Sequence, residues 1–469
     1  MTPAGEDRGT GERATTQTGG RPAIEGVIRG RYALSVGNPG DPIAPGWTWT
    51  ALTSVARLES GHTPSRRHPE YWDGDVPWIG IRDATRNHGR TLSDTAQHTN
   101  ELGIAKSSAR VLPADTVCLS RTASVGYVVV MGREMATSQD FVNWVCSPQL
   151  DHRFLKYILL AEHSTFLSFA SGTTHQTIYF PEVKAFHVCL PSLDLQRRIA
   201  DVLTEMDDLI ENNRRRIELL EEMSRVIYRE WFVHFRYPGH ETAAVVNSPA
   251  GPIPETWTIA PVEELASVEK GLSYKGAYLT QAGVPMANLK CLRPGGGFRR
   301  DGTKPYSGPH KPRHEVRPGD LVMANTDLTQ AGTVIGSPAF VPRRGFEDGG
   351  IISHHLFAIR CEDQSRIHWL YESFRDERFR AYARGVASGA TVLGFRPADL
   401  LAYPLACPPD RLLNEFATIR SELGTLIEDL EDSIETLVTL RDLLLPKLVT
   451  GQVDVSTLDL GSVLEGAAG

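Results

Sequence analysis

The most regular pattern in the chain is a pair of long stretches in which mostly apolar positions recur at alternating spacings of four and three. The first stretch runs through Ile199, Leu203, Met206, Ile210, Asn213, Ile217, Leu220, Ser224, Ile227 and Trp231. The second follows at an offset of 217 residues through Phe416, Arg420, Leu423, Ile427, Leu430, Ile434, Leu437, Arg441, Leu444 and Leu448. This repeat of 3.5 residues indicates a coiled coil. We therefore predict spacer helices over 192–236 and 409–450 that pair antiparallel; two unrelated amphipathic helices are the alternative.

Two residues of these helices call for separate predictions. Asn213 occupies a seam position whose counterpart in the second helix is Leu430. A single Asn in the seam can set the register, although a solvent-exposed Asn is an equally good interpretation. Pro446 should end or kink the second helix near its last turn, because proline lacks the backbone N–H.

The segments that precede the two helices resemble each other. VLPADTVCL (111–119) matches VRPGDLVMA (316–324), and SGTTHQTIYFPEVKAFHVCLP (171–191) matches SGATVLGFRPADLLAYPLACP (388–408). Trp47, Gly61 and Cys146 match Trp257, Gly271 and Cys361. The chain is thus a tandem repeat of a module followed by a helix. We predict modules over 45–191 and 255–408, a linker over 237–254, a disordered tail over 1–44 and a C-terminal tail over 451–469.

Short β-rich runs bounded by Gly, Pro and Asp predict mixed α/β modules. The strands are expected at Val76–Ile81, Thr116–Leu119, Gly126–Met131, Phe141–Cys146, Leu321–Ala324, Thr333–Ile335 and His355–Ile359. One helix is expected in each module, near Phe154–Phe169 and Trp369–Ala383.

Composition excludes some classes of protein. The chain of 469 residues is 41% apolar and 23% charged, as globular proteins are. It has no apolar run of eighteen residues and no apolar core in its first twenty, so we expect a cytoplasmic protein without a membrane span. We interpret the six cysteines as small buried side chains in a reducing compartment, with zinc binding or a disulfide as the alternative.

The net charge of −8 does not argue against DNA binding. Residues 410–469 carry four basic residues and twelve carboxylates, which together account for −8. The remainder of the chain is therefore neutral overall, and a neutral module can bind DNA if its basic residues gather on one face.

Several blocks resemble the specificity subunits of type I restriction–modification systems. LESGHTPSRRHPEYWDGDVPWIGIRDA (58–84) is similar to the start of a target-recognition domain in that family. LSRTASVGYVVV (119–130), ATSQDF (136–141), LPSLDLQRRIADVL (190–203), REWFVHFRYPG (229–239) and LLLPKLVTGQVDV (443–455) are similar to later blocks. The resemblance covers roughly 45–455. The second module departs most, because KGLSYKGAYLTQAGVPM (270–286) lacks the GxTP turn and the Tyr-Trp pair.

The resemblance implies two target-recognition domains, mixed α/β, separated by a long antiparallel two-helix coiled coil with pseudo-twofold symmetry. It implies a bipartite, asymmetric target in double-stranded DNA, with one half-site per module and the rod setting their spacing. Two methyltransferase subunits would flank this chain and restriction subunits would join them. S-adenosylmethionine, Mg²⁺ and ATP would belong to those partners, and this chain would hold no cofactor.

We expect no catalytic residue and no metal site in the chain. CysProProAsp (407–410) has the prolines of an adenine methyltransferase loop but lacks the Asn or Asp that would hold the flipped base. No phosphate-binding Gly-rich loop with lysine is present. Neighbouring residues of a strand face opposite ways, which argues against metal binding by His354 and His355. The alternatives are a stand-alone two-headed DNA-binding protein and a fragment of a fused restriction–methylation enzyme.

Polar and basic residues in loops are the candidates for DNA contact, since basic side chains suit phosphates and Arg, Asn and Gln suit base edges. In the first module they are Ser65, Arg66, Arg67, Arg82, Arg86, Arg90, Thr174 and Gln176. In the second module they are Arg299, Arg300, Lys304, Lys311 and Arg313. Solvated loops without a ligand are the alternative interpretation.

Overall fold

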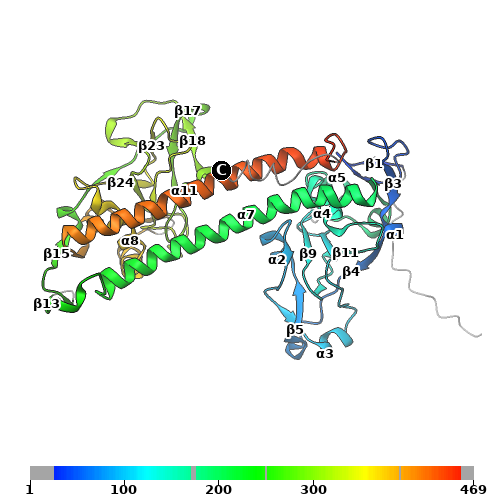
Figure 1. The fold of residues 1–469 in the computed structure, drawn as a ribbon, viewed down its shortest axis with the longest axis horizontal. Coiled ribbons are helices and arrows are strands. Elements are labelled where there is room, and N and C mark those ends of the chain that lie inside the picture. The colour runs from blue at the N-terminus through cyan, green and yellow to red at the C-terminus, as the bar shows by residue number, and fades with distance from the viewer. Residues whose placement is uncertain (1–25, 171–175, 249–250, 390–391, 456–469) are drawn as a thin grey trace, which may run out of the picture. The chain divides into compact units, whose positions relative to one another are not determined.

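The chain folds into two compact units in the computed structural model, which describes residues 26–170, 176–248, 251–389 and 392–455. Unit 1 comprises Met1–Leu209 and Thr436–Gly469, and unit 2 comprises Ile210–Glu435. The two long helices are α7 (Leu193–Tyr228) and α11 (Asp410–Leu448), drawn in green and in orange to red in Figure 1. Each unit therefore contains one module together with a part of each long helix.

The helix predictions agree with the structure to within a few residues, except at the end of the first. There α7 passes into a π-helical turn, Arg229–Val233, before the chain leaves the helix. Pro446 lies inside the last turn of α11, two residues before the helix ends at Leu448. All the seam positions named above are buried or half-buried, as the heptad pattern predicts.

Within each unit the two helices are in contact. In unit 2, Asn213 is buried and its Nδ2 donates to Ser433 Oγ at 3.2 Å, so Asn213 belongs to the seam and is not a solvent-exposed residue. Further along α7, Tyr228 lies 6.3 Å from Phe416, measured between ring centroids. The later residue of α7 contacts the earlier residue of α11, so the two helices are antiparallel in this unit. In unit 1 the helices are joined by Arg441, whose Nη1 donates to Asp207 Oδ1 at 2.9 Å.

The module of unit 1 is built on three small sheets. The largest has the order β4-β11-β8-β9-β6, and the others are β10-β5-β7 and β1-β2-β12-β3. Their bounds are β1 Ile28–Arg29, β2 Leu34–Val36, β3 Thr48–Ala51, β4 Ala56–Ser60, β5 Trp72–Ile79, β6 Thr91–Leu92, β7 His98–Thr99, β8 Val117–Ser120, β9 Val128–Met131, β10 Ala136–Thr137, β11 Phe141–Cys146 and β12 Phe186–Leu190.

Unit 2 repeats this topology, as the tandem repeat predicts. Its sheet β16-β24-β20-β22 matches β4-β11-β8-β9, and its sheet β18-β17-β23-β19 contains a parallel pair, β17 with β23, that matches β5 with β10. The bounds are β13 Val245–Ser248, β14 Gly251–Pro254, β15 Thr258–Pro261, β16 Ser267–Lys270, β17 Leu279–Ala287, β18 Lys304–Tyr306, β19 Glu315–Val316, β20 Leu321–Ala324, β21 Thr326–Asp327, β22 Pro338–Phe340, β23 Gly350–Ile352, β24 Leu356–Arg360, β25 Leu393–Gly394 and β26 Pro404–Cys407.

The expected strand at Thr333–Ile335 is wrong. These residues lie in a turn, and the strand of this region, β22, begins at Pro338. Val334 and Ile335 are apolar because they pack inward from that turn, which the alternation of residues alone does not distinguish from a strand.

The helix expected in each module is broken into two. The first region holds α4 (His152–Ala161) and α5 (Phe166–Phe169), and the second holds α8 (Ser365–Arg375) and α9 (Glu377–Val386). Asp376 ends α8 in an extended conformation and caps α9, since its side chain accepts the Arg378 N–H. The remaining helices of the modules are α1 Leu52–Val55, α2 Ile81–Arg86, α3 Glu101–Ala105, α6 Phe180–Lys184 and α10 Pro397–Leu401.

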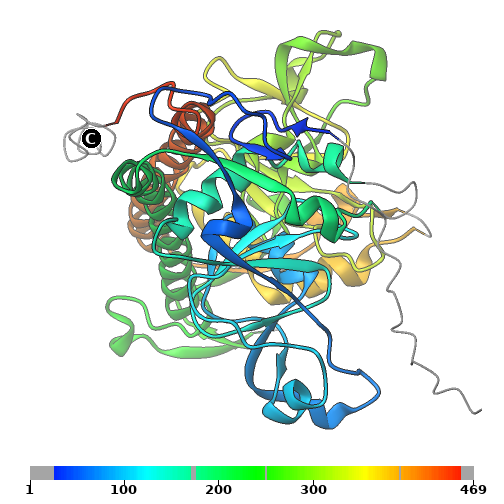
Figure 2. The same ribbon diagram turned by 90° about the vertical axis from the view of Figure 1, so that its right-hand side faces the viewer.

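The prediction of disorder over 1–44 is wrong for the described residues of that range. Leu34 and Val36 are fully buried in the core of unit 1, and β2 pairs with β12. Glu162, also fully buried, accepts the backbone N–H groups of Arg31 and Tyr32 at 2.8 and 2.6 Å. The low apolar content of residues 1–25 hides this ordered segment, in which Ala33, Leu34 and Val36 are buried. In Figure 2 the blue N-terminal strands lie beside the red end of α11, which shares their core.

The predicted linker and the described part of the C-terminal tail contain ordered structure. Within 237–254, β13 and β14 form a two-stranded antiparallel ribbon. After α11, Val455 is buried in the core of unit 1, and Gly451 sits so close to the Trp47 indole that a Cβ there would lie 2.8 Å from its Nε1. Among the described residues, no helix has the length and apolar character needed to cross a bilayer.

Candidate nucleic-acid interface

Four segments that are distant in the sequence meet in unit 1 at what we call the loop junction: residues 61–66, 121–124, 137–140 and 176–180. Three backbone hydrogen bonds join them. His62 N–H donates to Thr137 O at 2.9 Å, Arg121 N–H donates to Asp140 O at 2.7 Å, and Ile178 N–H donates to Arg121 O at 2.9 Å. These segments contain the polar parts of the blocks that the sequence singled out, so the fold gathers them in one place.

The same junction exists in unit 2, with equivalent bonds. Leu272 N–H donates to Ile352 O at 2.8 Å, Asn325 N–H donates to His355 O at 3.0 Å, and Phe395 N–H donates to Asn325 O at 2.8 Å. The two modules therefore present loops on a common backbone frame. The side chains on that frame differ, since Asn325 takes the place of Arg121.

A glycine permits the close approach in each junction. A Cβ on Gly61 would lie 1.9 Å from Ser138 O, and a Cβ on Gly271 would lie 2.2 Å from Ser353 O. Both obstacles are backbone atoms, which no side-chain rotation can remove. The repeated glycine that aligned the two modules is thus required by packing.

Three of the predicted residues lie in the turn that leads out of this junction. Ser65, Arg66 and Arg67 are all exposed. The turn is closed by His68 N–H, which donates to Ser65 O at 3.2 Å. Among the described residues, Arg66 and Arg67 have no carboxylate within ion-pair distance, so their charge is available to an anionic ligand.

The other predicted residues of the first module are more scattered. Arg82 and Arg86 lie on α2 and are exposed, and neither has an ion pair in the described part of the chain. Arg90, which follows α2, is also exposed but contacts another residue. Gln176 is exposed at the edge of the junction. Thr174 lies outside the described residues.

Sequence reasoning missed two residues of the first junction. Arg121 donates from Nη2 to Gln139 O at 3.1 Å, and its guanidinium lies 4.8 Å over the Phe180 ring. Burial lowers the pKa of Arg121, and only Asp140 opposes this effect. Gln139 is exposed beside it. Both residues lie in blocks 119–130 and 136–141, whose resemblance to the family indicated this region. The neighbouring sequence, however, does not distinguish these two side chains from the other polar residues of the blocks.

In the second module the basic stretch is largely committed to contacts within the protein. Arg300 is only 19% exposed and forms ion pairs with Asp432 and Glu435 of α11. Arg299 pairs with Asp301 at 2.8 Å. The guanidinium of Arg300 is thus engaged with the acidic face of α11, which argues against the predicted DNA contact. Lys304 is half-buried, and Lys311 and Arg313 are exposed; DNA contact by these three stays a prediction.

The loop between β20 and β22, residues 325–337, occupies in unit 2 the place that 121–127 occupies in unit 1. The buried carboxylate of Asp327 accepts the N–H groups of Thr329 and Val334 at 2.8 and 2.7 Å. Arg380, which is buried, donates from Nη2 to Thr333 O at 2.7 Å. The loop is thus fastened at its base, while Leu328 at its tip is 63% exposed. Sequence reasoning passed over this loop because it has few charges.

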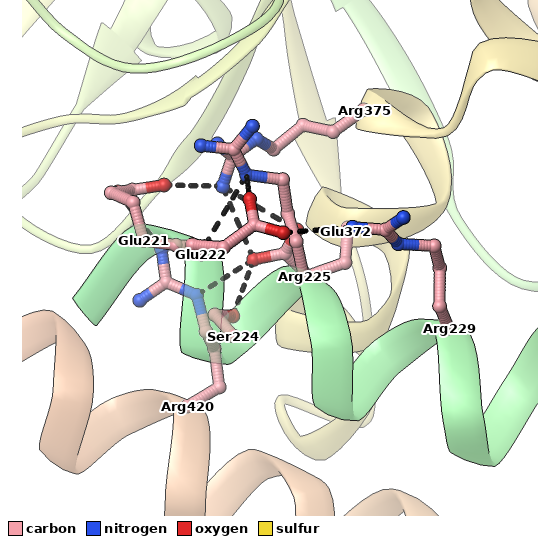
Figure 3. A network of polar contacts seen from close by, with 8 residues as sticks. All are labelled: Glu221, Glu222, Ser224, Arg225, Arg229, Glu372, Arg375 and Arg420. Atoms are coloured by element: carbon pink, nitrogen blue, oxygen red, sulfur yellow. Dashed lines mark hydrogen bonds and ion pairs between the residues drawn. The ribbon is translucent and has the colours of Figure 1, made fainter. Parts of the chain in front are cut away.

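A buried network of charges fastens the second module to the helix pair (Figure 3). Glu372 of α8, only 1% exposed, accepts hydrogen bonds from Ser224 Oγ at 2.6 Å and from Arg420 Nε at 3.1 Å. Arg375 reaches Glu221 at 2.5 Å. Burial favours the neutral form of Glu221, but Arg375 and Arg420 outweigh it and lower the pKa of that carboxyl.

In unit 1, polar contacts between different residues attach the module to the long helices. Lys156 of α4 lies 3.4 Å from Asp207 of α7, and Tyr157 Oη donates to the same carboxylate at 2.8 Å. Burial lowers the pKa of Lys156, although Asp207 opposes this effect. Each module is therefore attached to its helices by buried polar groups whose charges differ between the two units.

The two histidines considered for metal binding are not on a strand. His354 and His355 lie in the turn before β24, and their ring centroids are 3.9 Å apart, so the argument that they face opposite ways is wrong. Across the described part of the chain, however, no group of three or more potential ligands could hold a metal ion. All six cysteines are free thiols that are buried or half-buried.

Comparisons with known proteins agree with this architecture. Residues 45–222 match the family model of the type I restriction modification DNA specificity domain. The MjaIX specificity subunit of Methanocaldococcus jannaschii is 24% identical over 424 residues, which is 88% of this chain and 94% of that protein. Together with the structural neighbours, these comparisons indicate a type I restriction–modification specificity subunit.

Two further relatives define how far the likeness extends. The EcoR124I/EcoR124II specificity subunit of Escherichia coli is 26% identical over 208 residues, 42% of this chain and half of that protein. The crystal structure of the specificity subunit from M. genitalium superimposes with a TM-score of 0.57 at 15% identity, covering 88% of this chain and 98% of the other. The family model ends within α7, so the second module, which departs most from the family's blocks, is related through its fold and through the longer alignment.

Proposed function

We propose that this specificity subunit supplies the DNA address of a type I restriction–modification complex. Each module would bind one half-site of a bipartite, asymmetric sequence in double-stranded DNA. The observation that carries the proposal is the loop junction, whose backbone bonds are the same in both units while its side chains differ. A common frame with different side chains suits two related modules that recognise different bases.

The chemistry would belong to the partners. Methyltransferase subunits would hold S-adenosylmethionine and modify adenine, and restriction subunits would cut DNA with ATP and Mg²⁺. This chain would position them on the target in the cytoplasm. Its own polar clusters include structural ion pairs such as Glu372 with Arg420.

A surface of α7 in unit 2 is suited to a methyltransferase subunit. Leu219, Met223 and Val226 are 59%, 51% and 45% exposed, and their spacing of four and three residues places them on one helix face. Exposed apolar patches of this kind mark interaction sites in soluble proteins. We infer that a methyltransferase subunit packs an apolar helix face against them.

Module exchange tests the proposal. Residues 45–190 are replaced by the matching segment of a relative with a known target, and the methylated sequence is mapped across the genome with and without each gene. We expect one half of the methylated sequence to change while the other half stays. A change of both halves together, or methylation that does not depend on this gene, would refute the proposed division of labour.

A stand-alone DNA-binding protein is the competing function. It would be purified without a bound methyltransferase and would bind its target at full affinity alone. Co-purification of methyltransferase subunits with the wild-type chain, and their loss on replacement of Leu219 and Met223 by Glu, would favour the complex. Leu102→Glu, at a single exposed leucine of α3 in unit 1, is the matched control.

A further inference from the structure

Arg66 is held in place more firmly than an exposed side chain normally is. Its guanidinium carbon lies 4.5 Å from the ring centroid of Trp72 and 5.2 Å from that of Trp78. Its Nη2 donates to Gln97 Oε1 at 2.9 Å. Two aromatic rings and one hydrogen bond therefore fix both the plane and the rotation of the guanidinium.

The aromatic platform under Arg66 is itself rigid. Trp72 and Trp78 pack edge to face, with ring centroids 5.2 Å apart and an interplanar angle of 88°. Trp78 is buried, and its Nε1 donates to His62 O at 3.1 Å, which ties the platform to the loop junction. Trp78 N–H also donates to Gln97 O at 2.9 Å, so the glutamine that holds Arg66 is fixed to the same strand.

The charge of Arg66 is not used within the protein. Some exposed arginines of unit 1 are neutralised by neighbours: Arg110 pairs with Glu59 at 2.7 Å and Arg133 with Asp94 at 3.1 Å. Arg66 has no such pair among the described residues, and stacking on indoles uses none of its N–H groups. Of the five donors of a guanidinium, the one bound to Gln97 is accounted for, and the others remain for a ligand.

We propose, on the basis of the function proposed above, that Arg66 recognises a guanine in the half-site bound by the first module. Two parallel N–H groups of an arginine match the O6 and N7 acceptors that guanine presents in the major groove. Trp72, Trp78 and Gln97 are positioning residues: they hold the plane of the guanidinium so that little side-chain freedom is lost on binding. A phosphate contact would need no such fixed plane.

The described residues of the second module lack this device. Met286 stands where the first module has Trp78, and it is buried beneath Tyr306 and Ile351 in a small cluster of its own. Arg66 therefore adds a requirement to one half-site only, which contributes to the asymmetry of the whole target.

Selection from a library of randomised duplexes tests the proposal, with the full chain co-purified with the methyltransferase subunits of its own system. We expect the wild type to select a bipartite sequence with a guanine at one position that Arg66→Ala no longer selects. The preference at that position should fall about tenfold to hundredfold, while preferences at the other positions stay. Arg66→Lys keeps the charge but not the fork of donors, and should weaken the same guanine preference while affinity for non-specific DNA stays nearly unchanged.

Arg67→Ala is the matched control, since Arg67 is exposed in the same turn but has no aromatic platform in the described structure. It should weaken all sequences alike. Trp72→Phe should keep most of the guanine preference, and Trp72→Ala should reduce it at that one position. If Arg66→Ala and Arg66→Lys leave the selected sequence unaltered, Arg66 does not recognise a base and the inference is overturned. A wild-type complex that selects no sequence would instead refute the proposed function.

Discussion

Arg420 of α11 and Glu372 of α8 form an ion pair with 3.1 Å between Nε and Oε1, and their side chains are only 4% and 1% exposed. Burial disfavours the charged form of Arg420, yet Tyr371 and Glu372 hold the pKa of its guanidinium above the ordinary value. Arg420 occupies a position of the heptad seam, which is otherwise mostly apolar. The pair joins the second module to the helix that follows it.

Removing one partner of this pair should be costly. Glu372→Ala leaves the Arg420 charge buried without its partner, and we expect the free energy of unfolding to fall by about 3–5 kcal/mol in urea denaturation. Replacing both residues by Met should recover much of the loss, because the cost of burying charge is removed with the charge. Arg229→Ala, which breaks the exposed pair with Glu222 in Figure 3, should cost about 1 kcal/mol or less. Equal losses in Glu372→Ala and Arg229→Ala would contradict this account.

The junction glycines should be sensitive to the smallest substitution. In Gly61→Ala the new Cβ meets Ser138 O, so the 61–66 turn has to move and the first half-site should be lost from the selected sequence. Gly271→Ala should affect the second half-site in the same way through Ser353 O. Gly276→Ala is the control, since a Cβ there meets no atom within 4 Å. Selection from randomised DNA measures all three, and loss of the wrong half-site would contradict the assignment.

The fastening of the β20–β22 loop should matter for one half-site only. Asp327→Ala removes the acceptor for the Thr329 and Val334 N–H groups and should free the loop that carries Leu328. We expect weaker sequence preference in the second half-site, with the first unchanged. Asp327→Asn keeps one carbonyl oxygen and should be milder. A uniform loss of affinity for all DNA would show that the loop does not contact bases.

Stability should fall in mildly acidic solution. Burial, assisted by Arg420, lowers the pKa of His368 from its ordinary value near 6.5 to about 4. The folded chain therefore keeps His368 neutral while the unfolded chain takes up a proton below pH 6.5. The contribution of neutral His368 to the free energy of unfolding is fully present above that pH. It is lost as the pH falls towards 4, by up to about 3 kcal/mol at roughly 1.36 kcal/mol per pKa unit. His368→Gln should flatten the plot of unfolding free energy against pH between pH 6.5 and 4. An unchanged slope would show that other groups cause the loss of stability in acid.

Much of the architecture follows from the sequence because it depends on periodic or repeated features. The heptad positions from Ile199 to Trp231 place one apolar stripe on a helix whatever surrounds it, and they are buried or half-buried as predicted. The repeat of Gly61 as Gly271 reflects the same close approach of backbone atoms in both modules. Local patterns of this kind are determined by backbone geometry over a few residues.

Tertiary structure alone decided which polar side chains are available to a ligand. Arg66 and Arg300 both stand in basic stretches, and nothing near them in the sequence separates the two. Arg66 meets Trp72, Trp78 and Gln97, whereas Arg300 meets carboxylates of α11 more than 130 residues away. The availability of a charge depends on what other segments bring to it, and pairing between segments so distant in the chain leaves no periodic trace in the sequence.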